Sequence, residues 1–133
     1  MFNNPEELEM RKRKINFVMI LVKEDSNIAE RISVVINLAQ KHDAMIDAIT
    51  GILISIYFGV PLDHPDQKQK RLAFVNEISE SLGPFLSIVH GECECPVGNV
   101  GNENQMNFTV LLPGYKSKLN KLTTLEFGHI IAD

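Results

Sequence analysis

The sequence predicts an α+β sandwich of the ferredoxin-like, split βαβ type. Short apolar segments rich in β-branched residues alternate with amphipathic segments of helical period, and Gly or Pro separates most of them. The resulting order is β-α-β-β-α-β-β, followed by a short α-β. At 133 residues, 44% of them hydrophobic and 23% charged, the chain suits a single globular domain. We divide it into an N-terminal arm, residues 1–14, and a domain, residues 15–133.

The first predicted strand and helix follow the arm. Residues 15–22 are almost continuously apolar, which is typical of a strand covered on both faces. Ser26 or Asn27 can cap the next helix, and Glu30 stands where a capping box would have its acidic residue. Apolar residues then recur at helical spacing over residues 28–39, which predicts one buried stripe.

A hairpin and a second helix come next. Residues 44–50 and 52–58 are rich in β-branched side chains and flank Gly51, so we expect two closely paired strands. Asp and Pro residues at the start of the segment 63–82 favour a helix, which Gly83-Pro84 would end. The buried stripe predicted for this helix consists of Leu72, Val75, Ile78 and Leu82.

The last third of the chain predicts three strands and a short helix. A strand should start at Phe85, and residues 96–104 should form a turn before a strand over residues 106–112. Pro113 and Gly114 end that strand. A helix over residues 115–124 and a short strand over residues 129–132 complete the order.

Charge and hydropathy exclude several partners. The net charge is −4 and the pI is near 5.5, and the basic run at residues 11–14 follows three nearby glutamates, so we expect no nucleic-acid partner. The longest uncharged apolar run, residues 48–62, is shorter than the roughly 20 residues of a spanning helix and contains Gly and Pro. The N-terminus lacks an apolar signal region. These observations predict a cytoplasmic protein without a membrane partner.

Cys93 and Cys95 are the only cysteines of the chain. In an extended segment they would share one face and could not easily bridge each other, which favours reduced, half-buried strand thiols. A metal cluster with His90 and His64 is the alternative, although this spacing is not a recognised zinc pattern. A strand histidine with a hydrogen-bonded ring is the simpler interpretation of His90.

The segment around the predicted turn is the most specific motif of the chain. Gly98-Asn99-Val100-Gly101, followed by Met106 and an Asn-Phe-Thr-Val strand, resembles the glycine-bounded hairpin of class III adenylate and guanylate cyclase domains. In such a turn the glycines would supply positive φ angles. Residues 51–59 and 89–92 are similar to two further strands of that family. The resemblance extends over residues 15–133 and implies the same ferredoxin-like fold.

The residues that the family uses for metal binding are replaced. In the family, two carboxylates hold two divalent cations that activate the ribose hydroxyl and neutralise the triphosphate. Lys23 and Ile52 stand at the matching positions, and neither side chain can coordinate magnesium. Glu24 and Asp25 could replace only the first carboxylate, after a shift in register. The resemblance therefore implies no metal and no other cofactor.

The residues that the family uses for base selection and transition-state stabilisation are also largely missing. Ala48 and Pro113 stand at the two base-recognition positions, and the segment from Lys116 onward retains Asn120 but has no arginine. A single electrostatic donor typically contributes about 3–4 kcal/mol to catalysis, so losing both carboxylates and the arginine should abolish useful turnover. We therefore predict no catalytic residues and no enzyme activity, that is, a pseudoenzyme.

The preferred hypothesis is a dimerisation or regulatory module in signal transduction, forming a homodimer or a heterodimer with a cyclase-like domain. The candidate dimer hairpin consists of Gly98, Asn99, Val100, Gly101 and Met106. The alternative is a metal-free nucleotide or anion sensor that uses the former cleft, marked by Lys23, Ala48, Ile52, Pro113, Lys116 and Asn120. Residual purine nucleotide cyclase activity, or an unrelated ferredoxin-like enzyme with Cys93 as nucleophile, is a further alternative. The sequence does not identify a small-molecule ligand.

Overall fold

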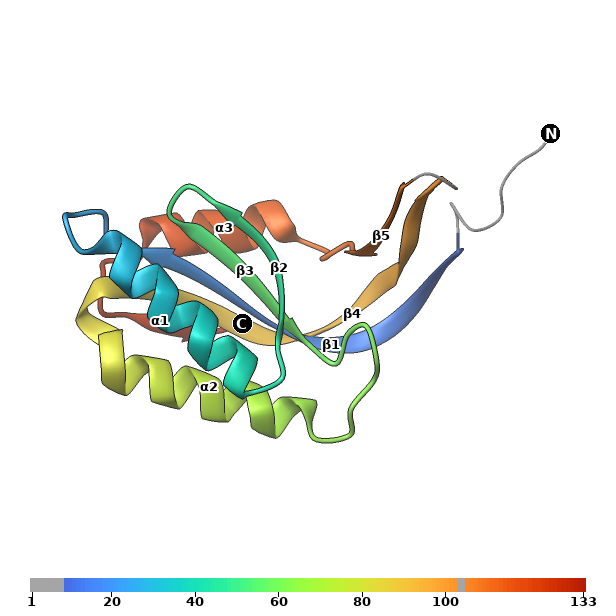
Figure 1. Cartoon of the computed structure of the whole chain (residues 1–133), viewed down its shortest axis with the longest axis horizontal. Coiled ribbons are helices and arrows are strands. Elements are labelled where there is room, and N and C mark those ends of the chain that lie inside the picture. The colour runs from blue at the N-terminus through green and yellow to red at the C-terminus, as the bar shows by residue number, and fades with distance from the viewer. Residues whose placement is uncertain (1–8, 103–104) are drawn as a thin grey trace.

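The computed structural model describes residues 9–102 and 105–133 and confirms the predicted order of strands and helices (Figure 1). A short 3₁₀ helix, Gly83–Phe85, follows the second α-helix. The elements are β1 (Glu9–Val22), α1 (Ile28–Lys41), β2 (Met45–Thr50), β3 (Leu53–Phe58), α2 (Gln67–Leu82), β4 (Leu86–Asn102), β5 (Gln105–Val110), α3 (Tyr115–Thr124) and β6 (Ile130–Ala132).

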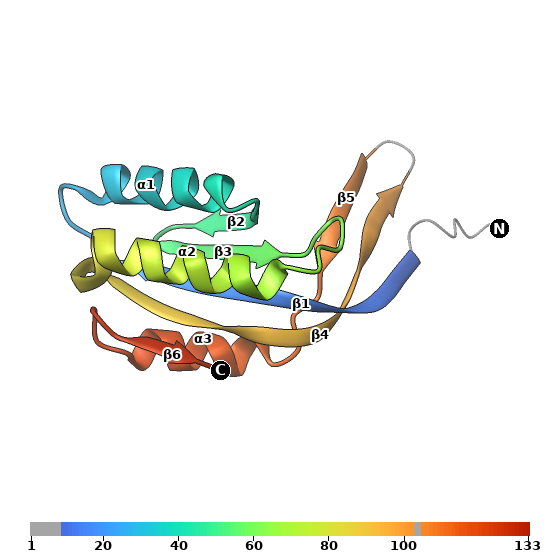
Figure 2. The same ribbon diagram turned by 90° about the horizontal axis from the view of Figure 1, so that it is seen from below.

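The strands form one sheet in the order β2-β3-β1-β4-β5, and neighbours along this path are antiparallel. The first four strands have the order expected of a split βαβ arrangement. The beginning of β4 also pairs in parallel with β6, from Ile88 opposite Ile130 to His90 opposite Ala132. Helices α1 and α2 cover one face of the sheet, and α3 lies on the other (Figure 2).

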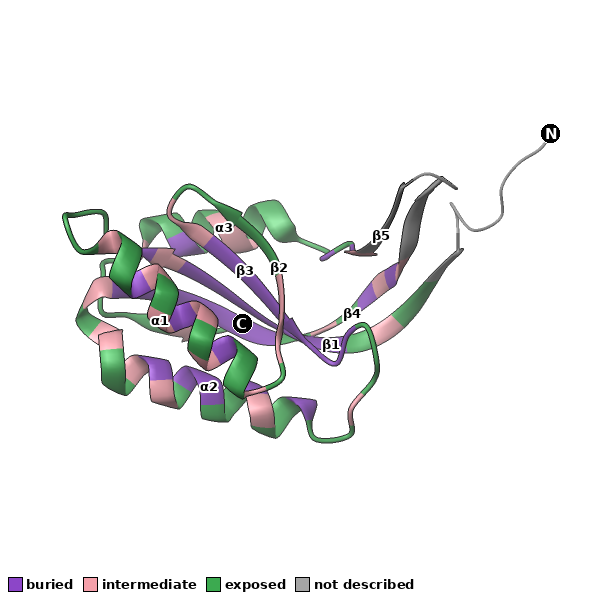
Figure 3. Ribbon diagram, viewed as in Figure 1, coloured by how far each residue is buried: buried purple, intermediate pink, exposed green. Residues whose placement is uncertain are grey.

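Alternating side chains of the central strands build two cores (Figure 3). On the α1/α2 face the fully buried side chains include Val18, Ile20, Ile54, Ile56, Phe74 and Ile88. On the α3 face they include Ile15, Phe17, Met19, Val89 and Leu122. The prediction that the first strand is covered on both faces is therefore confirmed. No helix in the described part of the chain has the length and apolar character needed to cross a bilayer.

The first strand is longer than predicted. It begins at Glu9, and its pairing with β4 runs from Glu9 opposite Asn99 to Val22 opposite Leu86. Residues 9–14, which we assigned to a polar arm, are thus strand, because the long β4 supplies backbone partners that local sequence does not reveal. The rest of the predicted arm, residues 1–8, lies outside the described residues.

The glycine-rich motif belongs to a strand. β4 continues to Asn102, with Gly98 opposite Thr109 and Gly101 opposite Met106 on β5. The turn predicted over residues 96–104 is therefore wrong for residues 96–102, because pairing with both β1 and β5 keeps this segment extended. Its last two residues, 103–104, lie outside the described residues.

Two details of the helices also differ from the predictions. Asn27 caps α1 without a side-chain hydrogen bond, so the capping box is not formed; Asp25 accepts a hydrogen bond from the Asn27 backbone instead, at 2.9 Å. In α2, Leu72 is 44% exposed, whereas Arg71 and Phe74 are buried beside Val75 and Ile78. The predicted stripe is thus confirmed for Val75, Ile78 and Leu82, which packs against the core, and wrong for Leu72; the buried face of α2 is also partly polar.

Candidate functional site

The two positions that the resemblance assigned to metal carboxylates lie side by side. The Val22 backbone N–H donates a hydrogen bond to the Ile52 carbonyl at 2.9 Å, so the end of β1 meets the turn between β2 and β3. Lys23, the next residue, is held by its backbone N–H, which donates to the Phe85 carbonyl at 2.8 Å. Lys23 is exposed and Ile52 is half-buried. Neither side chain offers the oxygen ligands that a hard cation requires.

The nearest substitute carboxylate is already paired. Asp25 forms an ion pair with the Arg31 guanidinium at 2.7 Å, and this guanidinium lies 3.8 Å from the centre of the Phe85 ring. The hydrogen bond from Arg31, followed by that from the Asn27 backbone, lowers the pKa of Asp25. Asp25 therefore stabilises the start of α1. Among the described residues, no three His, Cys, Asp or Glu side chains gather in a way that could hold a metal ion.

A hollow of about 500 Å³ opens on the α3 face of the sheet. It brings together Ala48 and Pro113, which the resemblance placed at the two base-recognition positions. Lys23, Ile52, Lys116 and Asn120 are not among its described lining residues. Those residues are Asp47, Ala48, Thr50, Ser55, Tyr57, Pro96, Val110, Leu111, Leu112, Pro113 and Tyr115.

Lys116 and Asn120 lie on the exposed part of α3. The carbonyl of Asn120 accepts hydrogen bonds from the hydroxyls of Thr123 and Thr124, at 3.2 and 3.0 Å. The six cleft residues predicted from the resemblance thus occupy three separate places: the end of β1, the hollow and the surface of α3.

The polar groups of the hollow were missed by the sequence analysis. The β2–β3 register shifts between Ile46 and Ala48, so Asp47 lies in a β-bulge. The sequence pattern did not predict this bulge. The Asp47 side chain is exposed at the surface, and partial desolvation of its carboxyl raises the pKa of Asp47. Burial also raises the pKa of Tyr57, and the nearby Asp47 charge adds to that effect. The hollow is therefore an apolar surface with one carboxyl and several hydroxyls.

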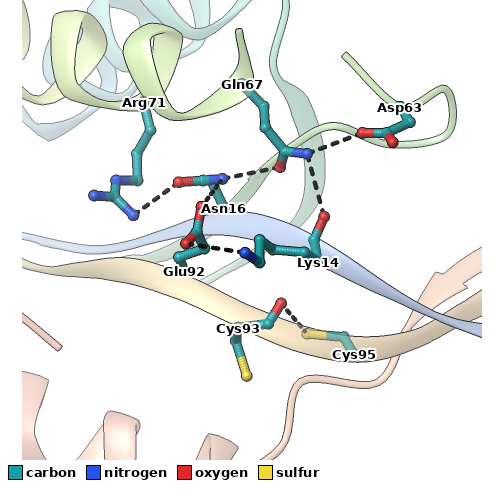
Figure 4. Close-up of polar contacts among 8 residues, drawn as sticks. All are labelled: Lys14, Asn16, Asp63, Gln67, Arg71, Glu92, Cys93 and Cys95. Carbon is teal, nitrogen blue, oxygen red and sulfur yellow. Dashed lines mark hydrogen bonds and ion pairs between the residues drawn. The ribbon is translucent and has the colours of Figure 1, made fainter. Parts of the chain in front are cut away.

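A cluster of hydrogen-bonded polar side chains is buried on the α1/α2 face (Figure 4). The Asn16 amide donates to Gln67 Oε1 at 2.9 Å, and its carbonyl oxygen accepts from Arg71 Nη1 at 2.8 Å. Gln67 in turn donates to Asp63 Oδ1 at 3.0 Å and to the Lys14 carbonyl at 3.2 Å. These contacts tie α2 and the segment before it to β1. We call Asn16, Gln67 and Arg71 the buried amide–guanidinium network.

His90 and Glu92 border this network from β4. Glu92 accepts a hydrogen bond from the Asn16 amide at 3.4 Å and lies 3.9 Å from Lys14 Nζ. His90 is buried with no partner for Nδ1 in the described structure, so the prediction of a hydrogen-bonded ring is wrong for that atom. Burial, followed by the charge of Arg71, lowers the pKa of His90.

The cysteines are free thiols, as predicted, with Cys93 half-buried and Cys95 buried. The Cys95 thiol lies 3.6 Å from the Cys93 carbonyl (Figure 4). Burial raises the pKa of Cys95 to about 12. Because Cys95 belongs to the α3-face core and His90 is an even-numbered residue of the same strand, the histidine points to the opposite face. The suggested cluster of His90, Cys93 and Cys95 is therefore not assembled.

Comparisons with known proteins give matches only at the level of structure. No family model matches the sequence, and no curated protein matches it. The guanylyl cyclase Cya2 superposes with a TM-score of 0.76 at 17% identity, over 92% of this chain and 76% of that one. The adenylyl cyclase CyaB from P. aeruginosa gives a TM-score of 0.67 at 14% identity, over 93% and 78% of the two chains.

A third similar structure is the monomeric guanylyl cyclase domain of the RhoGC fusion protein from the aquatic fungus Blastocladiella emersonii. Its TM-score is 0.73 at 11% identity, over 94% of this chain and 84% of that one. Another structure of the same fungal domain is a non-canonical dimer, with a TM-score of 0.71 at 12% identity, over 90% of this chain and 79% of that one. The strand order, the helix placement and these superpositions agree, and the chain has the fold of adenylyl and guanylyl cyclase catalytic domains.

Proposed function

We propose that this chain is a cyclase-homology domain that does not cyclise nucleotides and that serves as a dimerisation or regulatory module in cytoplasmic signal transduction. The observation that carries the proposal is the presence of Lys23 and Ile52 at the point where the end of β1 meets the β2–β3 turn. The hydrogen bond from Val22 to Ile52 brings together the two places where metal carboxylates would be needed. A cation and an aliphatic side chain occupy them, and the neighbouring Asp25 is paired with Arg31.

A direct assay tests the loss of activity. Purified protein is incubated with ATP or GTP in the presence of Mg²⁺ or Mn²⁺, and the formation of cAMP or cGMP is measured beside an active cyclase. We expect no product above the level without protein. Product that increases in proportion to the amount of protein would overturn the proposal.

The proposed dimer is supported by the long β4–β5 hairpin, which extends beyond the body of the domain (Figure 1). Its candidate contact residues are Gly98, Asn99, Val100, Gly101 and Met106. Similar domains have been described both as a dimer and as a monomer. A homodimer is the simplest arrangement, and a cyclase-like domain is the alternative partner.

Light scattering coupled to size exclusion tests the dimer. We expect twice the chain mass for the native protein and a shift toward the monomer for Gly98→Val/Gly101→Val, because added side chains alter the hairpin surface. Gly83→Ala, at the end of α2, serves as the matched glycine substitution. A native monomer, or a double variant that still dimerises fully while its circular dichroism is unchanged, would contradict this part of the proposal.

A second candidate function is a metal-free sensor, favoured by the hollow beside Ala48 and Pro113. Its volume of about 500 Å³ lies in the range of small-molecule sites, roughly 300–1,000 Å³. A thermal-shift screen with nucleotides, with and without magnesium, tests this function. A rise in melting temperature with ATP only when magnesium is present would show that the metal-free interpretation is wrong.

A further inference from the structure

The residues that line the hollow on the α3 face indicate which charge a ligand would need. Asp47 is the single charged residue among its described lining residues, and none of them is Lys, Arg or His. Residues 1–10 and 99–108, which include every position left out of the side-chain description, also contain no basic residue in the sequence. No positive side chain from those segments can therefore balance an anion in the hollow.

Most polar groups of the hollow come from one pair of strands. β2 and β3 supply the Asp47 carboxyl and the hydroxyls of Thr50, Ser55 and Tyr57, together with the methyl group of Ala48. The other lining residues follow the sheet from β4 to the start of α3, and they are apolar or aromatic: Pro96, Val110, Leu111, Leu112, Pro113 and Tyr115. Leu111 is 53% exposed and Tyr115 is 39% exposed, so apolar surface at the rim remains open. A ligand would meet polar groups along one side and apolar surface along the other.

We propose that this hollow binds a small amphipathic amine, with its protonated nitrogen at the Asp47 carboxylate and its apolar or aromatic body against Val110, Leu112, Pro113 and Tyr115. The inference rests on the second candidate function, because it names the class of ligand for that same site. A charge-assisted hydrogen bond to a partly desolvated carboxylate is stronger than a bond between neutral groups. The body of the ligand would gain from burial of apolar surface.

The same features disfavour the nucleotide or anion that the sequence suggested as a ligand. A triphosphate or carboxylate would lie near the Asp47 charge without a cation to compensate it. Like charges within a few ångströms repel each other, and desolvation of an unpaired anion adds a further cost. The hollow therefore selects against the charge that the family's substrates carry.

Three small probes of matched shape test the proposal: 2-phenylethylamine, 2-phenylethanol and 3-phenylpropanoate, which are cationic, neutral and anionic at neutral pH. Binding to the full chain is followed by amide chemical shifts in NMR titrations, and ATP without metal is titrated in parallel. For the amine we expect a Kd of about 1 mM, a reasonable value for a ligand of this size. The anions should bind at least about tenfold more weakly, as expected from the loss of one charge-assisted contact.

Asp47→Asn should remove most of the preference for the amine and leave the affinity for 2-phenylethanol within about twofold. Glu80→Gln, which removes an exposed charge on α2, is the control and should leave all affinities unchanged. Shifts that centre on Thr50, Ser55 and Tyr115 would locate the amine in the hollow. Equal or tighter binding of an anion, no detectable amine binding, or an Asp47→Asn variant with unchanged preference would each overturn the inference. None of these outcomes depends on the cyclase assay, so a failure here leaves the proposed lack of activity standing.

Discussion

The two faces of the sheet differ in whether their polar side chains are hydrogen-bonded to a helix or line an open hollow. On the α1/α2 face, Asn16 is fully buried and each end of its amide group is hydrogen-bonded to α2. On the α3 face, the hollow holds a single carboxyl among its described lining residues, that of Asp47. The polar side chains beneath α2 thus hold a helix to the sheet, whereas those of the hollow line an open surface.

The difference shows why this fold does not by itself indicate activity. Burying an arginine is costly unless its N–H groups find acceptors. Arg71 Nη1 donates to Asn16, whereas its buried Nε has no partner among the described residues, so the Asn16 contact is the one that offsets this cost. Positions 23 and 52, which the resemblance assigned to metal carboxylates, lie at the end of a strand and in a turn, so we expect side chains there to affect stability less. The fold can therefore persist without the residues of the reaction.

The largest effect on stability should come from Asn16→Leu. This change leaves the buried Arg71 guanidinium without its acceptor at 2.8 Å and Gln67 without its donor. We expect the free energy of unfolding in urea to fall by about 3 kcal/mol. Asn76→Leu, on the exposed side of α2, should change it by less than about 0.5 kcal/mol. Similar losses in the two variants would show that the network does not stabilise the α1/α2 face.

Gly91→Ala probes β4 just after the segment that pairs with β6. A Cβ at this position would overlap the carbonyl oxygen of Asp133 and lie 3.2 Å from a ring carbon of Phe17. We expect a loss of about 1–3 kcal/mol in the free energy of unfolding, as is typical of overpacking. At Gly83 an added Cβ meets its nearest neighbour at 3.8 Å, so Gly83→Ala should be tolerated. Equal stability of the two variants would mean that the end of the chain moves away freely.

His90 makes the α1/α2 face sensitive to pH. Because burial keeps its ring neutral, the unfolded chain takes up a proton below the ordinary pKa of 6.5 more readily than the folded chain does. This contribution to stability is present above that pH and is lost as the pH falls, with a slope of at most about 1.4 kcal/mol per pH unit. His90→Gln should flatten the pH dependence of urea unfolding below pH 6.5, whereas His129→Gln should leave it as in the native chain. A native slope in His90→Gln would contradict the assignment.

The smallest effect on stability should come from placing carboxylates at positions 23 and 52. Lys23→Asp/Ile52→Asp changes an exposed side chain and a turn side chain, so we expect less than about 1 kcal/mol of destabilisation. The variant should gain Mn²⁺ binding, measured by water-proton relaxation, because two oxygen ligands would then lie on adjacent backbones. Lys23→Asn/Ile52→Asn is the matched control without charge. If the Asp pair binds no more manganese than this control, these two positions do not form the former metal site.

Local sequence was sufficient to predict elements that are bounded by turn residues such as Gly and Pro. Gly51 between two β-rich segments predicted the β2–β3 hairpin, and Pro113 and Gly114 predicted the start of α3. The predictions failed where a distant partner decides the structure. Residues 9–14 and 96–102 are polar or glycine-rich, and they are strands because β1, β4 and β5 pair along their whole length.

The candidate site divides in the same way. Chain order and resemblance predicted Lys23, Ile52, Ala48 and Pro113 as cleft residues, since these stand at fixed distances from recognisable strands, and the structure brings Ala48 and Pro113 together. Asp47 was missed because it lies in a bulge, and bulges depend on the register of the partner strand. The stripe of α2 was wrong only for Leu72, because the periodicity of apolar residues does not predict that Arg71 is buried beside it.

The sequence alone predicts the absence of two-metal chemistry, because neither Lys23 nor Ile52 has a side-chain oxygen to ligate a divalent cation. It also determined the order of strands and helices, through periodicity and turn residues that act over a few positions. Only the tertiary structure decided which residues share a surface: Asp47 with Pro113 in the hollow, and Asn16 with Arg71 beneath α2. Those pairs are distant in the chain, and sheet register and helix packing bring them together.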